Sequence, residues 1–396
     1  MKPEWLDNLN IDVSLAKKLT FNPYYGELEA GLGETTCLVG KKFLDLASNN
    51  YLGLAGDPRV LAAARLALDE NGLSLCGTPI ATGANRLYNT LCRSLERFLG
   101  MERVLLYPSC YQANLGLFRA LAGKEDVTLV DQFAHASLLQ GIAATGCKVM
   151  PFLHNNMEHL QKLLGRCGRY RRILVVSESV FSTRGTICPL ADMQALAEEF
   201  DALPIIDDSH GIGVLGVRGR GILEHEHVEN FSGIYTASLG KALAGQGGMV
   251  AASAEIIEYL SYSNEALIYS TALTPPVIGG LLEVLRIIEE EFSQKSKRLT
   301  ANRSQLLRSA TEAGLKTIAG DAPIVGVQQG SDRATLILTR ELFKRGVFST
   351  PFLPPSVPPN QGVVRLIANA GLSEDQMCRA CHALKDAAEA SRRDTE

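Results

Sequence analysis

The chain has 396 residues, of which 46% are hydrophobic, 21% are charged and 6% are aromatic, and its formal net charge at pH 7 is −4. This length predicts two or three domains with a large core, and this composition is typical of an ordinary globular protein. The charges form no long runs, which excludes the basic stripe of a nucleic-acid-binding protein, and the apolar runs fall well short of the about 18 residues that a membrane span needs.

The N-terminus and the cysteines indicate a cytoplasmic protein. Residues 1–7 contain acids and no apolar h-region, so we expect no signal peptide. Nine cysteines, an odd number scattered through a long chain, indicate reduced thiols. The single CxxC, at 378–381, has no second pair and no nearby histidine trio, so we expect no metal site.

The predicted elements begin with an N-terminal segment, residues 1–45, that combines an amphipathic opening with a short polar arm. A large domain, residues 46–294, follows. Its apolar patterns predict strands at 43–47, 103–107, 127–130, 147–152, 172–177 and 204–208, and helices at 58–71, 89–99, 111–122, from 136 and at 276–294. Fully apolar strands that alternate with helices predict a mostly parallel sheet covered on both faces.

A smaller C-terminal domain, residues 295–396, has an α+β pattern. It opens with a basic stretch, 295–298, in a helix that we expect to be separate from the preceding one and to end near 314. Further strands are expected at 324–328 and 363–368, further helices at 333–345 and 373–391, and a stiff proline-rich loop at 351–359.

The stretch 235–248 places one lysine, Lys241, between small residues and glycines, directly after an apolar run. A crowded, partly desolvated turn lowers the pKa of a lysine amine, which can then form an imine with an aldehyde cofactor. Flanking glycines let a flat cofactor approach the backbone closely. A surface lysine in a flexible loop is the alternative, so the interpretation depends on partners elsewhere in the chain.

An acid and a histidine follow another predicted strand. Asp207 lies near the end of the strand at 204–208, and His210 comes three residues later. A buried carboxylate can hold a proton on a pyridine nitrogen, which turns the ring into an electron sink, while the histidine can bond the ring hydroxyl. A strand-end acid that caps a loop is the alternative.

Three further polar clusters follow predicted strands. His135 is placed to stack on an aromatic cofactor, although a lone helix-capping histidine is the alternative, and Ser182 is a small hydroxyl donor. Ser109, Cys110 and Tyr111 lie where a strand gives way to a helix, whose first backbone N–H groups can hold a phosphate. Because ligands of such sheets bind at the carboxyl ends of the strands, these clusters together predict a pyridoxal-phosphate site.

Several motifs carry a family resemblance over residues 48–376. They are S-N-N-Y-L-G-L at 48–54, D-Q-F-A-H-A-S at 131–137, V-F-S-T-R-G-T-I-C-P-L at 180–190, D-D-S-H at 207–210, T-A-S-L-G-K at 236–241, S-T-A-L-T-P-P at 270–276 and R-L at 365–366. With these motifs the chain resembles the α-oxoamine synthases, the fold-type I pyridoxal-phosphate enzymes that condense an amino acid with an acyl-CoA. The motif at 270–276 has one inserted residue. The resemblance implies an α/β large domain with a mostly parallel seven-stranded sheet covered by helices, plus the smaller α+β domain.

The resemblance also implies the cofactor, pyridoxal 5′-phosphate, and the residues that bind it. These are Ser109, Cys110, Tyr111, His135, Ser182, Asp207, His210, Ser238, Lys241, Ser270 and Thr271. Lys241 would carry the aldehyde and move the α-proton, Asp207 would pair with the pyridinium, and His135 would stack on the ring. His210 and Ser182 would bond the phenolic oxygen. Of these residues, Lys241, His135, Asp207 and His210 would be catalytic.

The remaining implied contacts concern the phosphate and the amino-acid substrate. Backbone amides of the helix start and the Ser238 hydroxyl would hold the phosphate, and Ser270 and Thr271 would reach it from the neighbouring subunit of a homodimer. Asn49 and Arg365 would hold the substrate carboxylate, for which an arginine offers a bidentate clamp.

The implied reaction joins an acyl-CoA, or an acyl carrier protein thioester, to a small L-amino acid such as alanine or 2-aminobutyrate, and releases CoA and CO2. Residues 85–96, 152–156, 182–187 and 346–348 resemble the quorum-sensing autoinducer synthases, which make long-chain α-aminoketones. Cys92 stands where biotin-pathway members carry a histidine. The alternative within the family is 8-amino-7-oxononanoate synthase, which acts on a pimeloyl thioester. Two hypotheses from other functional classes also remain, an aminotransferase and a non-catalytic scaffold subunit.

Overall fold

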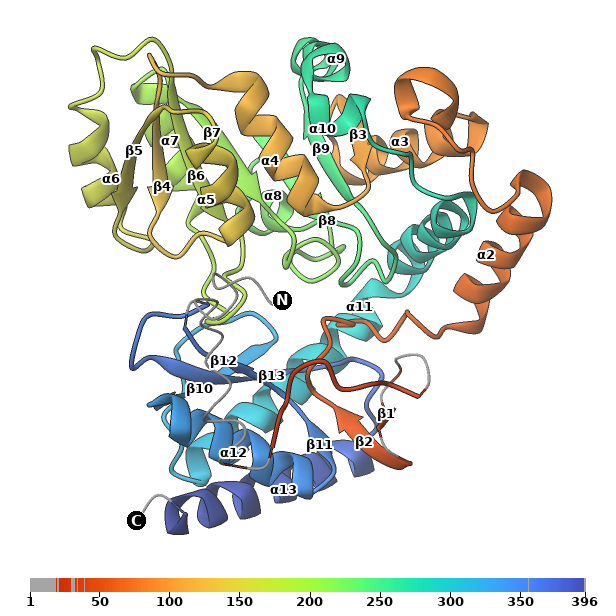
Figure 1. Cartoon of the computed structure of the whole chain (residues 1–396), viewed down its shortest axis with the longest axis vertical. Coiled ribbons are helices and arrows are strands. Elements are labelled where there is room, and N and C mark those ends of the chain that lie inside the picture. The colour runs from red at the N-terminus through yellow and green to blue at the C-terminus, as the bar shows by residue number, and fades with distance from the viewer. Residues whose placement is uncertain are drawn as a thin grey trace, which may run out of the picture.

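The computed structural model describes residues 19, 21–29, 33, 35–38, 40–354 and 356–394, so most of the predicted N-terminal segment lies outside the described residues. The ribbon forms a larger and a smaller unit, joined by one long helix, α11 (Pro275–Glu312), as Figure 1 shows. Among the described residues no helix has both the length and the apolar character needed to cross a membrane.

The larger unit is built on a seven-stranded sheet. Its strand order is β3 (Arg103–Tyr107), β9 (Gly248–Ala252), β8 (Ile234–Ser238), β7 (Leu203–Asp207), β6 (Ile173–Glu178), β4 (Val127–Asp131) and β5 (Lys148–Phe152). All strands from β8 to β5 pair in parallel, whereas β9 is antiparallel to both of its neighbours. The mostly parallel seven-stranded sheet is therefore confirmed.

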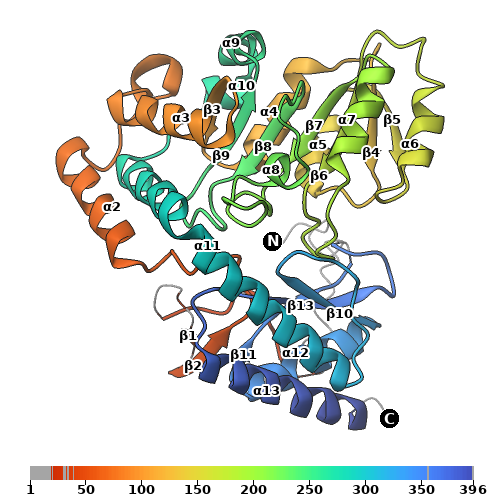
Figure 2. The ribbon, with the colours of Figure 1, turned by 180° about the vertical axis from the view of Figure 1, so that it is seen from behind.

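Helices cover both faces of this sheet, as Figures 1 and 2 show from opposite sides. Four pack on one face: α4 (Cys110–Leu121), α5 (Ala136–Ala143), α9 (Ala254–Ser263) and α10 (Glu265–Ile268). The other face is covered by α3 (Arg86–Leu99), α6 (Met157–Leu164), α7 (Leu190–Glu199) and α8 (Ile222–His225). Along β6, Leu174 and Val176 join the core under α4 and α5, whereas Val175 joins the opposite core. A strand with apolar residues on both faces is stable only in such a covered sheet.

The smaller unit contains two three-stranded sheets and two helices, α12 (Asp332–Lys344) and α13 (Glu374–Arg393). One sheet has the order β10 (Ile324–Gly330), β13 (Gly362–Ile367) and β12 (Thr350–Phe352). The other has β1 (Thr35–Leu38), β2 (Lys41–Asp45) and β11 (Val347–Phe348). Since β2 pairs in parallel with β11, residues near the start of the chain lie against C-terminal strands. The chain then enters the larger unit through α2 (Pro58–Asn71) and the π-helical turn η2 (Pro79–Gly83).

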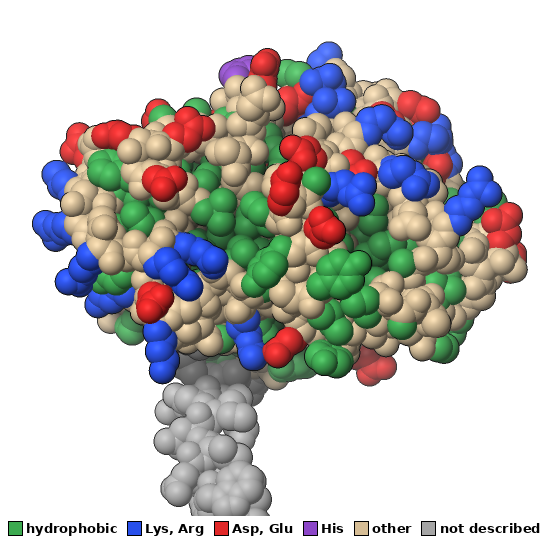
Figure 3. All heavy atoms as spheres, turned by 90° about the horizontal axis from the view of Figure 1, so that it is seen from above, with side chains coloured by type: hydrophobic (Ala, Val, Ile, Leu, Met, Phe, Trp, Pro, Cys, Tyr) green, Lys and Arg blue, Asp and Glu red, His purple; other side chains and the backbone are tan. Residues whose placement is uncertain are grey.

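The helix break expected near residue 295 is wrong, because α11 runs through it without interruption for 38 residues. The basic stretch 295–298 contains only serine, lysine and arginine, which do not stop a helix. The proposed domain boundary at 294/295 thus falls within α11, and it stays a prediction. Viewed from above, the larger unit exposes acidic, basic and apolar side chains interspersed over one surface (Figure 3).

Candidate active site

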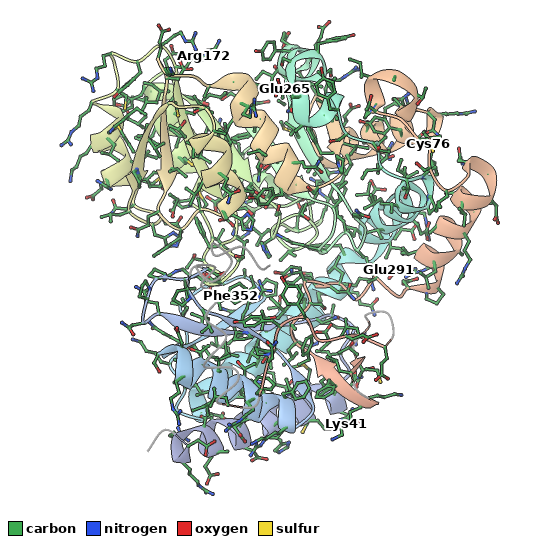
Figure 4. All side chains as sticks on the ribbon, in the orientation of Figure 1. Lys41, Cys76, Arg172, Glu265, Glu291 and Phe352 are labelled. Atoms are coloured by element: carbon green, nitrogen blue, oxygen red, sulfur yellow. The ribbon has the colours of Figure 1, made fainter. Side chains whose placement is uncertain are left out.

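A cavity of about 460 Å³ opens at the carboxyl ends of the central strands. In Figure 4, Arg172, which directly precedes β6, lies at the end of the sheet remote from the smaller unit, so the carboxyl end of β6 faces that unit. The lining comes from strand ends and from the loops that follow them: Pro108, Ser109, Cys110, Tyr111, His135, Ser137, Glu178, Asp207, Ser209, His210, Ser238, Gly240, Lys241, Gly245, Gln246 and Gly247. Eight of the residues predicted from the sequence therefore meet in one cavity.

Lys241 lies in the glycine-rich turn between β8 and β9 and lines the cavity. Burial lowers the pKa of its amine, although the nearby Asp207, Cys110 and Glu178 act in the opposite direction. Desolvation disfavours the charged ammonium, so a larger fraction of the amine is neutral than in a surface lysine. A neutral amine can bond an aldehyde and can accept a proton.

Asp207, the last residue of β7, is fixed by several donors. Its Oδ2 accepts from Asn114 Nδ2 at 2.7 Å and lies 3.8 Å from Cys110 Sγ, and its Oδ1 accepts from the Ser209 backbone N–H at 3.0 Å. Asn114 is fully buried in α4, and sequence reasoning missed it. The available signal was a polar amide between the apolar positions Ala113 and Leu117 of the helix.

His135 lies in the cavity wall and also caps a helix, so both sequence interpretations describe it. Its Nδ1 accepts from the Ser137 backbone N–H at 3.2 Å at the start of α5, and Ser137 Oγ lies 2.8 Å from the same nitrogen. Asn114 Nδ2 also contacts Ser137 Oγ at 3.0 Å, so polar contacts run continuously from His135 to Asp207. Burial lowers the pKa of His135, which favours a neutral ring.

His210 lines the cavity from the loop after β7, and its Nδ1 lies 2.8 Å from the Tyr51 hydroxyl. Glu178, the last residue of β6, is a further lining residue to which the sequence analysis gave no role. Burial raises the pKa of Glu178 well above its usual value, and the charge of Asp207 adds to the effect, while its side chain accepts from the His135 backbone N–H. A neutral carboxyl therefore lies beside the ionisable groups of the cavity.

The first turn of α4 also lines the cavity. The Ser109 side chain accepts from the Gln112 backbone N–H at 3.1 Å and caps the helix, and the next two residues, Cys110 and Tyr111, line the cavity. Gly248 of β9 packs directly on this turn, because a Cβ at that position would lie 2.3 Å from the Cys110 nitrogen. This close approach requires glycine at position 248. The backbone N–H groups at the start of α4 can bind an anion such as a phosphate.

Other predicted residues lie outside the lining. Arg365 of β13 donates from Nη1 to the Ser182 carbonyl at 3.2 Å and from Nη2 to the Ala47 carbonyl at 3.5 Å. Its Nε, like Asn49 Oδ1, is buried and has no hydrogen-bond partner among the described residues. Arg365 is only 7% exposed, and burial lowers its pKa. The structure thus brings Ser182 and Arg365 together, next to the segment that carries Asn49.

The two residues predicted to act from a neighbouring subunit lie beside α4 in the single chain. Ser270 Oγ accepts from Gln112 Nε2 at 3.2 Å, and Thr271 is exposed. Their contribution to a partner's cavity stays a prediction.

Comparison with known proteins places this geometry in a family. Residues 41–384 match the model of the class I and II aminotransferases. The 2-amino-3-ketobutyrate coenzyme A ligase of Escherichia coli K12 is 34% identical over 353 residues, which cover 88% of each chain. The 8-amino-7-oxononanoate synthase of Nitrosococcus oceani is 35% identical over 362 residues, which cover 91% of this chain and 96% of that enzyme. The chain belongs to the α-oxoamine synthase family.

Solved structures similar to this α-oxoamine synthase include serine palmitoyltransferases. The enzyme from Sphingomonas wittichii is 27% identical and superposes with a TM-score of 0.92, and the match covers 96% of this chain and 96% of that enzyme. A serine palmitoyltransferase from S. paucimobilis, solved with a bound adduct of pyridoxal phosphate and myriocin, is 25% identical with a TM-score of 0.94, covering 99% of this chain and 100% of that one. The fold is that of the fold-type I pyridoxal-phosphate transferases.

The cofactor of this α-oxoamine synthase is pyridoxal 5′-phosphate, and the cavity fits it. Lys241 supplies an amine for the aldehyde, the fixed Asp207 carboxylate suits a protonated pyridine nitrogen, and the start of α4 suits the phosphate. The Ser238 backbone N–H donates to Ser209 Oγ at 2.9 Å, and the Ser238 side chain lines the same end of the cavity. The enzyme is a pyridoxal-phosphate-dependent acyltransferase of this family.

Proposed function

We propose that this enzyme condenses an acyl-CoA with a small L-amino acid and releases CoA and CO2 to give an α-aminoketone. The observation that carries the proposal is a buried arginine, Arg365, whose Nε has no hydrogen-bond partner among the described residues. It lies outside the cavity lining but close enough to Lys241 and His210 to add to the effect of burial, which lowers the pKa of both. The name of one relative, 2-amino-3-ketobutyrate coenzyme A ligase, supports the use of a coenzyme A thioester, although the acid it names keeps its carboxyl group. The name 8-amino-7-oxononanoate synthase supports an α-aminoketone product.

Each polar group of the cavity has a task in this reaction. Pyridoxal phosphate, when bound, withdraws the electron pair that a broken bond leaves on the amino-acid α-carbon. Asp207 keeps a proton on the pyridine nitrogen, and Asn114 and the Ser209 backbone N–H hold its two oxygens in place. Lys241, whose pKa burial lowers, removes the α-proton and later returns a proton to the same carbon.

Substrate orientation falls to Asn49 and Arg365. The Ser182 and Ala47 carbonyls hold the Arg365 guanidinium, and its Cζ lies over the Phe352 ring, 4.7 Å from the ring centroid. A guanidinium held in this way can receive a carboxylate in two parallel hydrogen bonds, and the Nε of Arg365 is free to make one of them. Fixing the carboxylate decides which bond at the α-carbon can break.

A thiol-release assay with the holoenzyme tests this function. Purified enzyme, an acyl-CoA and L-alanine should release free CoA and CO2 in equal amounts. Transfer of the amino group to a keto acid without CoA release would instead identify an aminotransferase and overturn the proposal.

We further propose that the acyl donor has a medium or long unbranched chain and that the product is a quorum-sensing autoinducer precursor. Two segments that resemble autoinducer synthases, 152–156 and 182–187, lie in contact: His154 Nε2 is 2.8 Å from Thr186 Oγ1, and Asn155 Nδ2 donates to the Ile187 carbonyl at 2.8 Å. His154 Nδ1 also contacts the buried Asp131, which begins the loop that carries His135. The two segments thus form one connected group beside the loop that carries His135, although none of their residues lines the cavity.

The alternative donor is a pimeloyl thioester, as in 8-amino-7-oxononanoate synthase. Cys92, the residue that differs from the biotin-pathway pattern, is buried in the core on α3 and does not line the cavity, so it has no direct influence on the donor. Decanoyl-CoA and pimeloyl-CoA, each assayed with L-alanine and with L-2-aminobutyrate, separate the two. A strong preference for pimeloyl-CoA would replace the autoinducer assignment.

We also propose a homodimer in which each cavity receives Ser270 and Thr271 from the other subunit. Tyr262 and Tyr269 precede this segment and are 72% and 82% exposed, which is unusual for aromatic side chains outside an interface. A mixture of two inactive variants, Lys241→Ala and Ser270→Ala/Thr271→Ala, should regain activity after subunit exchange, because one cavity of each mixed dimer is then intact. If exchanged mixtures stay inactive, each cavity is complete within its own chain.

A further inference from the structure

Tyr51 contacts the cavity wall from outside the sheet that carries the other site residues. It belongs to the turn after β2, its side chain is fully buried, and its hydroxyl lies 2.8 Å from Nδ1 of His210. The two rings meet edge to face, with centroids 6.1 Å apart and planes at 80°. The contact joins residues 159 positions apart in sequence, across the junction of the two units.

The direction of this hydrogen bond follows from the two environments. Burial raises the pKa of Tyr51, so its hydroxyl keeps its proton and can donate it. Burial also lowers the pKa of His210, and three cationic or basic groups that face the ring, Lys241, Arg365 and His135, add to the effect. The imidazole is therefore neutral and carries one N–H. His210 Nδ1 is the only hydrogen-bond partner of the buried Tyr51 hydroxyl among the described residues, so the O–H is left without an acceptor unless it donates to Nδ1. Donation to Nδ1 puts the ring proton on Nε2.

We propose that Tyr51 is a positioning residue that fixes the tautomer of His210, so that Nε2–H donates to the phenolic oxygen of bound pyridoxal phosphate. The proposal rests on the cofactor-binding role of His210 within the proposed function and is independent of the acyl donor. His210 lines the cavity, and with Nδ1 engaged by Tyr51, Nε2 is the ring nitrogen left for the cofactor. The tyrosine hydroxyl acts through the histidine and does not touch the substrate.

A donor at the phenolic oxygen has a measurable effect on the resting holoenzyme. It stabilises the negative oxygen and so weakens the attraction of that oxygen for the proton on the imine that links Lys241 to the cofactor. Without the Tyr51 hydroxyl, Nδ1 can hold the ring proton, and Nε2 would then present a lone pair to the negative oxygen. The imine should hold its proton more tightly, and its pKa should rise.

The test is a titration of the visible absorption of the holoenzyme, without substrate, in the Tyr51→Phe variant. Because a hydrogen bond to a charged group contributes about 1.5–3 kcal/mol and one pKa unit corresponds to 1.36 kcal/mol, we expect the imine pKa to rise by about one unit. Tyr88→Phe is the matched control. Tyr88 is also a buried tyrosine, but its hydroxyl accepts only a long bond, 3.4 Å, from the Leu106 backbone N–H. An unchanged titration in Tyr51→Phe, or an equal shift in Tyr88→Phe, overturns the proposal.

Two further measurements separate this role from a structural one. In a His210→Asn background, Tyr51→Phe should produce no additional shift, since the residue through which it acts is gone; an additive shift overturns the proposal. Nitrogen NMR of the histidine-labelled wild-type holoenzyme should show His210 protonated at Nε2, and a proton on Nδ1 overturns it even if the variant fails to fold. An enzyme that forms no coloured imine at all refutes the cofactor site itself, which is a different failure.

Discussion

The two walls of the cavity differ in how completely their ionisable groups are paired. On the wall formed by the large sheet, both oxygens of Asp207 accept hydrogen bonds, and His210 is paired with Tyr51. On the opposite side, which we call the opposite wall although Arg365 and Asn49 lie outside the cavity lining, Arg365 makes only two bonds to backbone carbonyls. Its Nε and the Asn49 Oδ1 lack partners among the described residues. Buried polar groups nearly always have a hydrogen-bond partner. We therefore interpret these two free atoms as the place where a ligand supplies the missing hydrogen bonds. We therefore expect the sheet wall to hold the resident cofactor and the opposite wall to receive the substrate carboxylate.

Removing the covalent anchor should have the largest effect on the sheet wall. Lys241→Ala is expected to abolish turnover, because no other lysine lines the cavity. Borohydride should then fail to fix the cofactor to the protein, as judged by mass spectrometry of the reduced chain. Lys148→Ala, an exposed lysine on β5, is the control and should behave as the wild type. Retained turnover in Lys241→Ala would contradict the assignment.

The opposite wall is tested by Arg365→Lys, which keeps the charge but removes the planar fork. We expect the KM for the amino acid to rise about 100-fold, because the loss of one or two charged hydrogen bonds of about 1.5–3 kcal/mol each corresponds to a tenfold change per 1.4 kcal/mol. The absorption spectrum of the resting holoenzyme should stay unchanged, since the residues around the cofactor are untouched. A changed absorption spectrum with an unchanged KM would contradict this assignment, because Arg365 would then act on the cofactor and not on the substrate.

A smaller effect is expected from Asn114→Ala on the sheet wall. The variant leaves Asp207 Oδ2 without its 2.7 Å donor, so the carboxylate holds the pyridine nitrogen less firmly. We expect kcat/KM to fall about tenfold and the cofactor to be lost more readily on dilution. Asn302→Ala is the matched control, because Asn302 is a buried amide that donates to the Asn369 carbonyl at 2.8 Å, away from the cavity lining. Equal cofactor loss in the two variants would show that Asn114 serves stability alone.

Local patterns in the sequence predict the sheet wall well. Each strand of that wall is an apolar run followed by polar residues, and the carboxyl ends of parallel strands must meet, so Asp207, His135 and Lys241 could be brought together without coordinates. The family resemblance added Asn49 and Arg365, which come from distant parts of the chain. The roles assigned to these residues remain predictions.

What escaped prediction depends on contacts between elements that no local pattern encodes. The Tyr51–His210 pair joins two elements 159 residues apart, and Asn114 is recognisable only once α4 is packed against the end of β7. The continuous α11 was missed because a run of basic residues was taken as the end of a helix, although none of them interrupts helical hydrogen bonding. Tertiary packing decides the first two features, whereas the third follows from local helix propensity.

The smallest expected effect concerns stability behind the sheet wall. Asp208 follows Asp207 but does not line the cavity; it is fully buried and accepts from the Tyr235 hydroxyl at 2.7 Å and the Ile222 backbone N–H at 2.9 Å. Burial raises the pKa of Asp208 from 3.8 to about 7. The folded protein therefore binds more protons than the unfolded chain between these two values, so the free energy of unfolding should fall as pH rises through this window and then level off.

Asp208→Asn removes this titration and keeps the side-chain size. Between about pH 5 and about pH 8, the Tm of the wild type should fall by more than that of the variant, because only the wild type must ionise a buried carboxyl. Calorimetry of both holoenzymes at the two pH values measures the difference. An equal fall of Tm in the two proteins would mean that Asp208 is ionised over the whole pH range. The sheet wall would then hold two adjacent negative charges, those of Asp207 and Asp208, whereas the opposite wall holds the single positive charge of Arg365.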